Sequence, residues 1–376
     1  MLSNLKQIIS TEPAYRRKQI EKAWFDISIN SFDGITTLPA TLREKLMDIP
    51  WLTVKQETIL TSKLDNTRKL LFELEDGNFI ETVIMGRENL KKTRLSFRAS
   101  PAQDDEESLS QLLNGQRFLP SVEMTNEKLS VDRYTICISS QVGCAMRCVF
   151  CATGKAGFKR NLEAEEIIDQ IRFCQRLLAK EKARISNIVV MGQGEPLLNY
   201  ANVKRALQVI LANTDIGPTK ITVSTCGIPN IMEKLLEDKD FPQVRWAISL
   251  HSAIEKTRAE IMPSHQKGFL EFLIKWSIDY NKKIPSRTHF IGLEYIMMSG
   301  TNDDEKHLQA LIKFAKRMPK IRINLIPFNS DDQDAINRVS TTKMIEHWHD
   351  EIMKAGFTST IRHSHGQDIA AACGQL

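Results

Sequence analysis

From residue 131 to the C-terminus, short apolar runs alternate with longer amphipathic segments. Helical periodicity is clear in segments 163–180 and 266–281, where apolar residues recur on one face. The apolar runs predict six strands, at 134–139, 187–191, 220–224, 245–250, 289–297 and 322–327. Strands joined by crossover helices form a parallel sheet. The pattern therefore predicts an α/β fold, a partial (β/α)6 barrel with its functional groups at the carboxyl ends of the strands.

Residues 1–85 carry a different pattern, which predicts a small N-terminal helical accessory domain. Amphipathic helices are expected at 13–25, where a proline stands at the first helical position, and at 37–47. Strand-like runs at 69–74 and 79–85 flank the sequence EDGN, which is typical of a hairpin turn. This domain is therefore expected to end in a β-hairpin.

Segment 86–130 separates this domain from the barrel domain, residues 131–376. A basic run is followed by an acidic one, and neither helix nor strand periodicity is strong. Such a segment is interpreted as an insertion or linker that is partly mobile. Two roles remain open for it, a solvated surface loop and an arm that contacts a nucleic acid.

The composition of the chain excludes several classes of protein. The 376 residues include 51 Lys and Arg against 46 Asp and Glu, a formal charge of +5, which permits an acidic partner but excludes binding by charge alone. Seven cysteines in a chain of this length disfavour a secreted disulfide scaffold. No stretch approaches the ~20 apolar residues of a membrane span, and the first residues lack a signal peptide's apolar run. We therefore expect a cytoplasmic protein without a membrane partner.

Three cysteines, Cys144, Cys148 and Cys151, form a C-x3-C-x2-C motif directly after the first barrel strand. Thiolates suit zinc, copper(I) or iron–sulfur clusters. A structural zinc site needs four ligands, whereas three thiolates on a four-iron cube leave one iron open for another ligand. A zinc loop with a distant fourth ligand and a loop of ligand-free cysteines are the alternatives. The motif at this strand resembles the radical S-adenosylmethionine (SAM) superfamily, which implies a [4Fe-4S] cluster whose open iron binds SAM.

Polar residues and glycine recur where the predicted strands end. They are Gly194, Glu195, Ser224, Ser249, His251 and Asn329. Each one alone is more often a turn former or a helix cap. Because the ends of parallel strands share one rim, the set together predicts a ligand site there.

The remaining cysteines differ in their surroundings. Cys137 lies within the first barrel strand, where a buried apolar cysteine is the default expectation. Cys373 lies in a tail of small residues that should pack little and expose its thiol. Cys174 and Cys226 are expected to be packed in the interior.

Longer motifs extend the resemblance over nearly the whole chain except 86–130. SSQVGCAMRCVFCATG, GFKRNL, MGQGEPLLN, SLH, INLIPFN and DIAAACGQL are similar to motifs of the RlmN/Cfr family of RNA adenine methyltransferases, and LFELEDGNFIETV is similar to its N-terminal strands. The resemblance implies that Cys144, Cys148 and Cys151 hold the cluster. It further implies that SAM is bound by Gly194, Glu195, Ser224, Ser249, Leu250, His251 and Asn329.

The resemblance also implies catalytic roles for Cys373, Cys137 and Glu81. In that family SAM is used twice per turnover. Cys373 would take a methyl group as a thiolate nucleophile, and a deoxyadenosyl radical from a second SAM would remove hydrogen from the S-methyl group. The resulting carbon radical would add to adenine, Glu81 would accept the ring proton, and Cys137 would attack Cys373 in a transient disulfide that releases the product.

The sequence departs from the family's pattern in several places. Gln193 and Ala370 stand where relatives often have Met and Asp, and the chain ends three residues after Cys373. Segment 86–130 lengthens the distance between Glu81 and Cys137. Glu123, fourteen residues before Cys137, is therefore an alternative base, although the residues flanking Glu81 match the family better.

The resemblance implies methylation of adenine C2 in 23S rRNA, with tRNA as a second target. The alternatives are methylation at C8, another radical SAM activity, and a non-catalytic RNA-binding or iron–sulfur assembly protein. A reduced flavodoxin or ferredoxin is the expected electron donor, and the enzyme is expected to be a monomer. Candidate phosphate contacts are Arg16, Arg17, Lys18, Lys22, Lys155, Lys159 and Arg160, each of which is equally compatible with an ordinary solvated surface.

Overall fold

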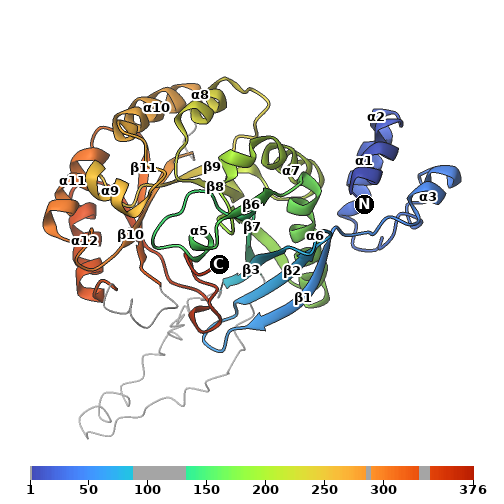
Figure 1. Cartoon of the computed structure of the whole chain (residues 1–376), viewed down its shortest axis with the longest axis horizontal. Coiled ribbons are helices and arrows are strands. Elements are labelled where there is room, and N and C mark those ends of the chain that lie inside the picture. The colour runs from blue at the N-terminus through green and yellow to red at the C-terminus, as the bar shows by residue number, and fades with distance from the viewer. Residues whose placement is uncertain (1, 88–132, 285–288, 330–338) are drawn as a thin grey trace, which may run out of the picture.

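The computed structural model describes residues 2–87, 133–284, 289–329 and 339–376. Its main sheet has ten strands in the order β1-β2-β3-β4-β7-β8-β9-β10-β11-β12. Figure 1 shows this sheet curving into a partial barrel whose outer face is covered by helices. Of the predicted insertion 86–130, all but its first two residues lie outside the described residues, and so does Glu123.

Parallel strands form the barrel wall from β4 to β12. Their bounds are β4 (Arg133–Ile138), β7 (Arg184–Val190), β8 (Ile221–Thr225), β9 (Arg245–Ser249), β10 (Ile291–Met297), β11 (Ile321–Pro327) and β12 (Thr358–Ile361). Each pairs in parallel with its neighbour. The first six coincide with the six predicted strands, so the predicted fold class is confirmed. β12 carries one apolar residue in four, and for that reason the hydrophobic pattern does not predict it.

Helices alternate with the strands and pack on the outside of the barrel. They are α6 (Ala164–Lys180), α7 (Tyr200–Asn213), α8 (Pro229–Glu237), α9 (Glu255–Ile261), α10 (Phe269–Lys283), α11 (Glu305–Ala315) and α12 (Thr342–Lys354). Short 3-10 helices lie in the connections and in the C-terminal tail: η2 (Pro196–Asn199), η3 (Pro218–Lys220) and η5 (Gln367–Ile369). A separate two-stranded sheet pairs β5 (Gln141–Gly143) with β6 (Phe158–Asn161), and α5 (Ala152–Ala156) precedes β6.

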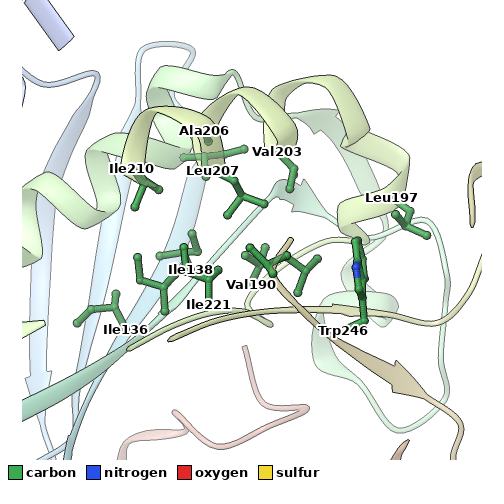
Figure 2. Packing of buried hydrophobic residues seen from close by; sticks show 14 of the residues in the cluster. Ile136, Ile138, Val190, Leu197, Val203, Ala206, Leu207, Ile210, Ile221 and Trp246 are labelled. Carbon is green, nitrogen blue, oxygen red and sulfur yellow. The ribbon is translucent and has the colours of Figure 1, made fainter. Parts of the chain in front are cut away.

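The apolar face of α7 packs over β4, β7 and β8 (Figure 2). Residues from both sides of this contact include Val203, Leu207, Ile210, Ile138 and Val190. Burying each such side chain stabilises the fold by roughly 1.5–3 kcal/mol. This packing holds the helix layer against the strands, so that the strand ends keep fixed positions.

The N-terminal strands extend the barrel sheet. β1 (Val54–Thr61), β2 (Arg68–Leu74) and β3 (Phe79–Arg87) are antiparallel to one another, and β3 pairs antiparallel with β4. The predicted hairpin is confirmed, with Gly77 at φ +75° in the turn. The domain boundary at residue 85 stays a prediction. In the structure it falls inside β3, and the strands before it are hydrogen-bonded into the barrel sheet.

Three helices precede these strands, α1 (Leu2–Ser10), α2 (Ala14–Trp24) and α3 (Ala40–Leu46). The last two confirm the predicted helices at 13–25 and 37–47. The hydrophobic pattern does not predict β1, because β1 is a largely exposed edge strand with a polar sequence. Arg172 of α6 anchors this region, since its guanidinium is buried against the rings of Trp24 and Trp51 and pairs with Asp169.

Gln170 of α6 connects the N-terminal strands to the first barrel strand. Its side-chain oxygen accepts hydrogen bonds from Thr82 Oγ1 and from the Ser139 backbone N–H, both at 2.8 Å. Its Nε2 donates to the carbonyl oxygen of Ser139 at 3.0 Å. Gln170 is fully buried, so these partners have no access to water.

We predict that Gln170→Leu lowers the free energy of unfolding by about 3 kcal/mol, because it leaves buried polar groups of Thr82 and Ser139 without partners. Chemical denaturation of the full chain measures this change. Gln309→Ala, which removes an exposed side-chain contact on α11, is the control and should change stability by less than about 0.5 kcal/mol. Equal losses in both variants would contradict the role assigned to Gln170.

Candidate active site

The cysteine loop, residues 144–151, follows β5. Gly143 has φ +72°, and a Cβ atom at this position would lie 1.8 Å from the carbonyl oxygen of Gly157. The same oxygen accepts a hydrogen bond from the backbone N–H of Cys144 at 3.0 Å. Only glycine permits this close approach, which fixes the start of the loop against the chain that leaves α5.

A cavity lies between the cysteine loop and the carboxyl ends of the barrel strands, and we call it the cysteine-loop cavity. The predicted site residues that line it are Cys144, Cys148, Cys151, Gly194, Glu195, Ser224, Ser249, His251 and Cys373. The structure therefore brings most of the candidate residues to one place. Leu250 and Asn329 do not line this cavity: the Leu250 side chain is fully buried, and Asn329 lines a neighbouring cavity.

Burial acts on two thiols of the cysteine loop, Cys144 and Cys148. It raises the pKa of Cys144 to about 11 and, together with the neighbouring thiols, that of Cys148 to about 12. A bound cation reverses this effect, because it stabilises the thiolate form. Within the described ranges no three His, Cys, Asp or Glu side chains converge on one point. An iron–sulfur cube does not require such convergence, because each of its thiolates binds a different iron.

Glu195 is a buried carboxylate held by its surroundings. Its Oε1 accepts from the backbone N–H of Leu197 (2.9 Å), and its Oε2 accepts from the N–H (2.8 Å) and thiol (3.0 Å) of Cys226. Burial raises the pKa of Glu195 despite these bonds. The preceding Gly194 has φ +107°, and a Cβ there would lie 2.6 Å from the Gln141 side chain. The loop after β7 can therefore approach β5 only through this glycine.

His251 is a neutral ring beside the cysteine loop. Burial, and secondly the charge of Arg258, lower the pKa of His251 to about 3. Its Nδ1 accepts from the backbone N–H of Ile296 (3.0 Å), and its ring packs edge-on against Phe150 with centroids 4.7 Å apart. Since Nδ1 is occupied as an acceptor, the neutral ring carries its proton on Nε2.

The C-terminal tail reaches the barrel centre and brings Cys373 to the cysteine loop. The backbone N–H of Ala152 donates to the carbonyl oxygen of Gly374 at 2.8 Å, and the Thr153 hydroxyl donates to the carbonyl oxygen of Leu376. Asn329 Nδ2 donates to the carbonyl oxygen of Cys373 at 3.4 Å. Contrary to the expectation of a loosely packed tail, these bonds hold it in place.

A second cavity, which we call the tail cavity, joins the two remaining candidate cysteines. Its lining includes Cys137, Asn329, Arg362, Ala371 and Cys373. Both cysteines are free thiols in the structure. Burial, and secondly the nearby Cys373, raise the pKa of Cys137 to about 12. Cys137 is therefore buried as expected, but it also shares a cavity with Cys373.

Glu81 lies outside the lining of both cavities but close to the tail. Its Oε1 forms an ion pair with Lys69 Nζ at 3.0 Å, and the same Nζ donates to the carbonyl oxygen of Ala370 at 3.0 Å. Both side chains are largely buried, 17% and 13% exposed. Strand register sets Val83 opposite Cys137, and Glu81, two residues before Val83, faces the same side of the sheet.

The candidate phosphate contacts differ in availability. Arg160 pairs with Glu166 at 2.8 Å and with Asp76 at 2.5 Å, and these contacts raise its pKa further. The two carboxylates compensate the positive charge of Arg160, which leaves less of it for a phosphate. Arg17 pairs with Glu21. Lys18, Lys22 and Lys155 are exposed. The lysines therefore remain better candidates than Arg160.

The sequence model of the radical SAM superfamily matches residues 138–339. This range covers more than half of the chain and includes the cysteine loop and strands β7 to β11. The chain belongs to the radical SAM superfamily.

Solved structures with similar folds include a radical SAM methyltransferase from Sphaerobacter thermophilus. It is 28% identical, with a TM-score of 0.78, and the similarity covers 99% of this chain and 96% of that chain. SuiB of Streptococcus suis, bound to S-adenosylmethionine, is 15% identical with a TM-score of 0.41 over 60% of this chain and 49% of that chain. A domain of the pyruvate-formate lyase-activating enzyme of Bacteroides vulgatus is 17% identical with a TM-score of 0.36 over 47% and 99%.

Membership in the radical SAM superfamily implies a [4Fe-4S] cluster and SAM, and the residues of the cysteine-loop cavity fit both. Three soft thiolates line it together, which suits an iron–sulfur cube with one open iron. Glu195 supplies a carboxylate for an ammonium group, and Ser224 and Ser249, whose hydroxyls lie 3.4 Å apart, supply polar contacts. In the described part of this radical SAM protein, no helix is long and apolar enough to cross a membrane.

Sequence reasoning missed three residues of this site. Arg362, directly after the unpredicted β12, lines both cavities and donates from Nη2 to Glu294 Oε1 at 2.9 Å. Glu294 interrupts an apolar strand, a signal that could have marked it as an inward-facing charge. Cys226 is buried as expected, as is Cys174, but it also lines the cysteine-loop cavity and contacts Glu195.

Arg362 acts on both candidate catalytic thiols. Burial raises the pKa of Cys373, although its side chain is accessible within the cavity, and the Arg362 charge opposes that rise. We predict that Arg362→Gln raises the pKa of Cys373 by about one unit, so that its alkylation below that pKa slows about tenfold. Iodoacetamide labelling of cluster-free protein across a pH series, quantified on the Cys373 peptide, measures this. Arg322→Gln, an exposed arginine on β11, is the control, and equal rates in both variants would refute the effect.

Proposed function

We propose that this chain methylates C2 of an adenine in 23S rRNA, and of an adenine in tRNA, through an S-methylated Cys373. The methyltransferase activity is supported by the similarity, over nearly the whole chain, to the radical SAM methyltransferase of Sphaerobacter thermophilus. The adenine target is supported by the resemblance of the cysteine-loop, strand-end and tail motifs to the RlmN/Cfr family.

The observation that carries the proposal is the place of Cys373. It lines the cysteine-loop cavity on one side and the tail cavity, with Cys137, on the other. A cysteine that must first accept a methyl group from SAM and later form a disulfide needs access to both the SAM site and the second thiol. The tail places Cys373 between the two candidate sites.

The cluster and SAM, when bound, supply the methyl group and the abstraction of a hydrogen atom, chemistry that amino-acid side chains do not provide. Cys373 binds the methyl carbon through its sulfur and holds it at the boundary of the two cavities. Adenine C2 is an aromatic C–H carbon without nucleophilic character, so it cannot take a methyl group from SAM by direct displacement. It therefore receives the carbon from Cys373, to which that carbon is first attached.

Two further residues complete the transfer. Glu81, oriented by Lys69 beside the tail, accepts the proton that leaves adenine C2. The Cys137 thiolate attacks the sulfur of Cys373, which forms the S–S bond and breaks the S–C bond. The electron pair of that S–C bond stays with the carbon on adenine, which takes up a proton and becomes the methyl group. The single unpaired electron left by the radical addition would return to the bound cluster, and a cellular dithiol later reduces the disulfide.

The substrate adenine must leave its stack to reach such a site, so the target is a loop or another unpaired segment. The exposed lysines Lys18, Lys22 and Lys155 are proposed phosphate contacts. A reduced flavodoxin or ferredoxin is the proposed electron donor.

We predict that Cys373 of the purified protein carries an S-methyl group, and that Cys373→Ala abolishes product formation. Mass spectrometry of the protein, and of rRNA and tRNA from cells that express each variant in a deletion background, measures both. Cys174→Ala, at a buried cysteine that lines neither cavity, is the matched control and should retain activity.

The position of the added methyl group separates the alternatives. 2-Methyladenosine supports the proposal, whereas 8-methyladenosine would reassign the chain to C8 chemistry. Full RNA methylation by Cys373→Ala would refute the two-cysteine mechanism. If the reconstituted protein forms no deoxyadenosine with SAM and a reductant, the result would support the alternative of a non-catalytic RNA-binding or iron–sulfur assembly protein.

The base is tested by comparing Glu81→Gln with Glu123→Gln. If Glu81 removes the proton from C2, Glu81→Gln should stall as a covalent protein–RNA adduct and lose at least 100-fold in turnover (on the order of 10²–10⁴ for a positioned base). Denaturing electrophoresis with labelled RNA detects the adduct. A stall in the Glu123 variant with normal turnover of the Glu81 variant would transfer the role to Glu123.

A further inference from the structure

Arg258 of α9 carries a buried charge that forms no ion pair with a carboxylate of the described residues. The residue is 2% exposed. Its Nη2 donates to the carbonyl oxygen of Cys226 at 2.7 Å, its Nη1 lies 2.7 Å from His265 Nδ1, and its guanidinium lies 4.3 Å from the centroid of the Phe269 ring. Its Nε is buried without a hydrogen-bond partner. All of these partners are neutral.

A second buried arginine of the same chain, by contrast, has a carboxylate partner. Arg172 is also 2% exposed, but its guanidinium forms an ion pair with Asp169. Among the described residues no carboxylate forms such a pair with Arg258. The half-exposed Glu255, on the same helix, acts on Arg258 through space only. Taking a guanidinium out of water costs several kcal/mol unless an opposite charge compensates. Burial accordingly lowers the pKa of Arg258 to about 10, which still leaves the side chain protonated at neutral pH.

The surroundings of Arg258 indicate where a negative charge that compensates its guanidinium would lie. Cys226, whose carbonyl oxygen binds Arg258, belongs to the same apolar cluster as Ile261, Met262 and the half-buried Cys148. The carbonyl oxygen of Ile261, at the end of α9, accepts from the backbone N–H of Val149 at 3.1 Å. The helix that carries Arg258 therefore also holds the cysteine loop.

We propose that Arg258 is the buried counter-cation of the [4Fe-4S] cluster and raises its reduction potential. Three thiolates give the bound cluster a net negative charge, and reduction adds one more electron. A fixed positive charge in a low-dielectric interior stabilises the more negative, reduced form. This inference depends on the cluster that superfamily membership implies, and it is independent of the RNA target.

The test compares the cluster's midpoint potential in full-length wild-type protein and in Arg258→Gln, reconstituted anaerobically and titrated without SAM or RNA. At the wild-type midpoint potential, the ratio of reduced to oxidised cluster should fall about tenfold in Arg258→Gln, a shift of about −59 mV for one electron. Electron paramagnetic resonance of the reduced cluster measures this ratio. Arg317→Gln, at a half-exposed arginine paired with Glu271 on the protein surface, should leave the potential unchanged.

A second pair of variants keeps Arg258 in place and decides the question if Arg258→Gln does not fold or bind iron. His265→Glu places a carboxylate beside the guanidinium and should lower the potential in the same direction, whereas the neutral His265→Gln should not. Iron and sulfide contents equal to those of the wild type exclude incomplete loading as the cause. An unchanged potential in His265→Glu, or in a fully loaded Arg258→Gln, overturns the proposal. RNA methylation enters none of these measurements, so the two proposals fail separately.

Discussion

The docking of the C-terminal tail is the constraint on which the candidate site depends. A cysteine three residues from the chain end is placed at the centre of the barrel only because hydrogen bonds restrain the segment before and after it. Asp368 accepts from Ser62 Oγ and from the Lys63 backbone N–H, both at 2.7 Å, and Lys69 binds the carbonyl oxygen of Ala370. Ala152 then binds the carbonyl oxygen of Gly374 beyond Cys373. The tail is thereby tied to the N-terminal strands and to the cysteine loop together.

This arrangement gives the N-terminal strands a part in the proposed chemistry. Because β3 pairs with β4, Val83 stands opposite Cys137, and Glu81 faces the same side of the sheet. Because the turn between β1 and β2 holds the tail, the position of Cys373 depends on residues more than 300 positions earlier in the chain. An N-terminal extension of the barrel sheet thus supports, from one side, the three residues that we propose as base, second thiol and methyl carrier.

Burial in the barrel interior favours the neutral form of each ionisable group whose pKa it shifts. Desolvation raises the pKa of the buried thiols and of Glu195, and it lowers those of His251 and Arg258. Apart from any bound group, the interior therefore favours neutral thiols and a neutral imidazole. For the thiols, Arg362 and Arg258 oppose this tendency at two different places, one beside Cys137 and Cys373 and the other beside the cysteine loop. One arginine thus lies beside the thiols for which we propose disulfide exchange, and the other lies beside the proposed cluster ligands.

The sequence by itself determined the six barrel strands, the hairpin and the three cysteines of the loop. Hydrophobic periodicity reports burial on one face, and a motif of cysteines at short spacing needs no distant partner to be visible. It did not reveal β1 or β12, because edge strands with polar residues carry no apolar alternation. It placed Glu195 and His251 at strand ends, but not the hydrogen bonds of Cys226 and Ile296 that orient them.

Only the tertiary structure decided which distant residues meet. Glu294 of β10 and Arg362, directly after β12, form an ion pair, and Arg258 lies buried beside Cys226 without a carboxylate partner among the described residues. The single sequence lacked these facts because contacts between residues 30 to 300 positions apart depend on how strands and helices pack. The local hydrophobic pattern shows which face of a helix or strand is apolar. Which polar groups become buried against that face depends on how the helices and strands pack together.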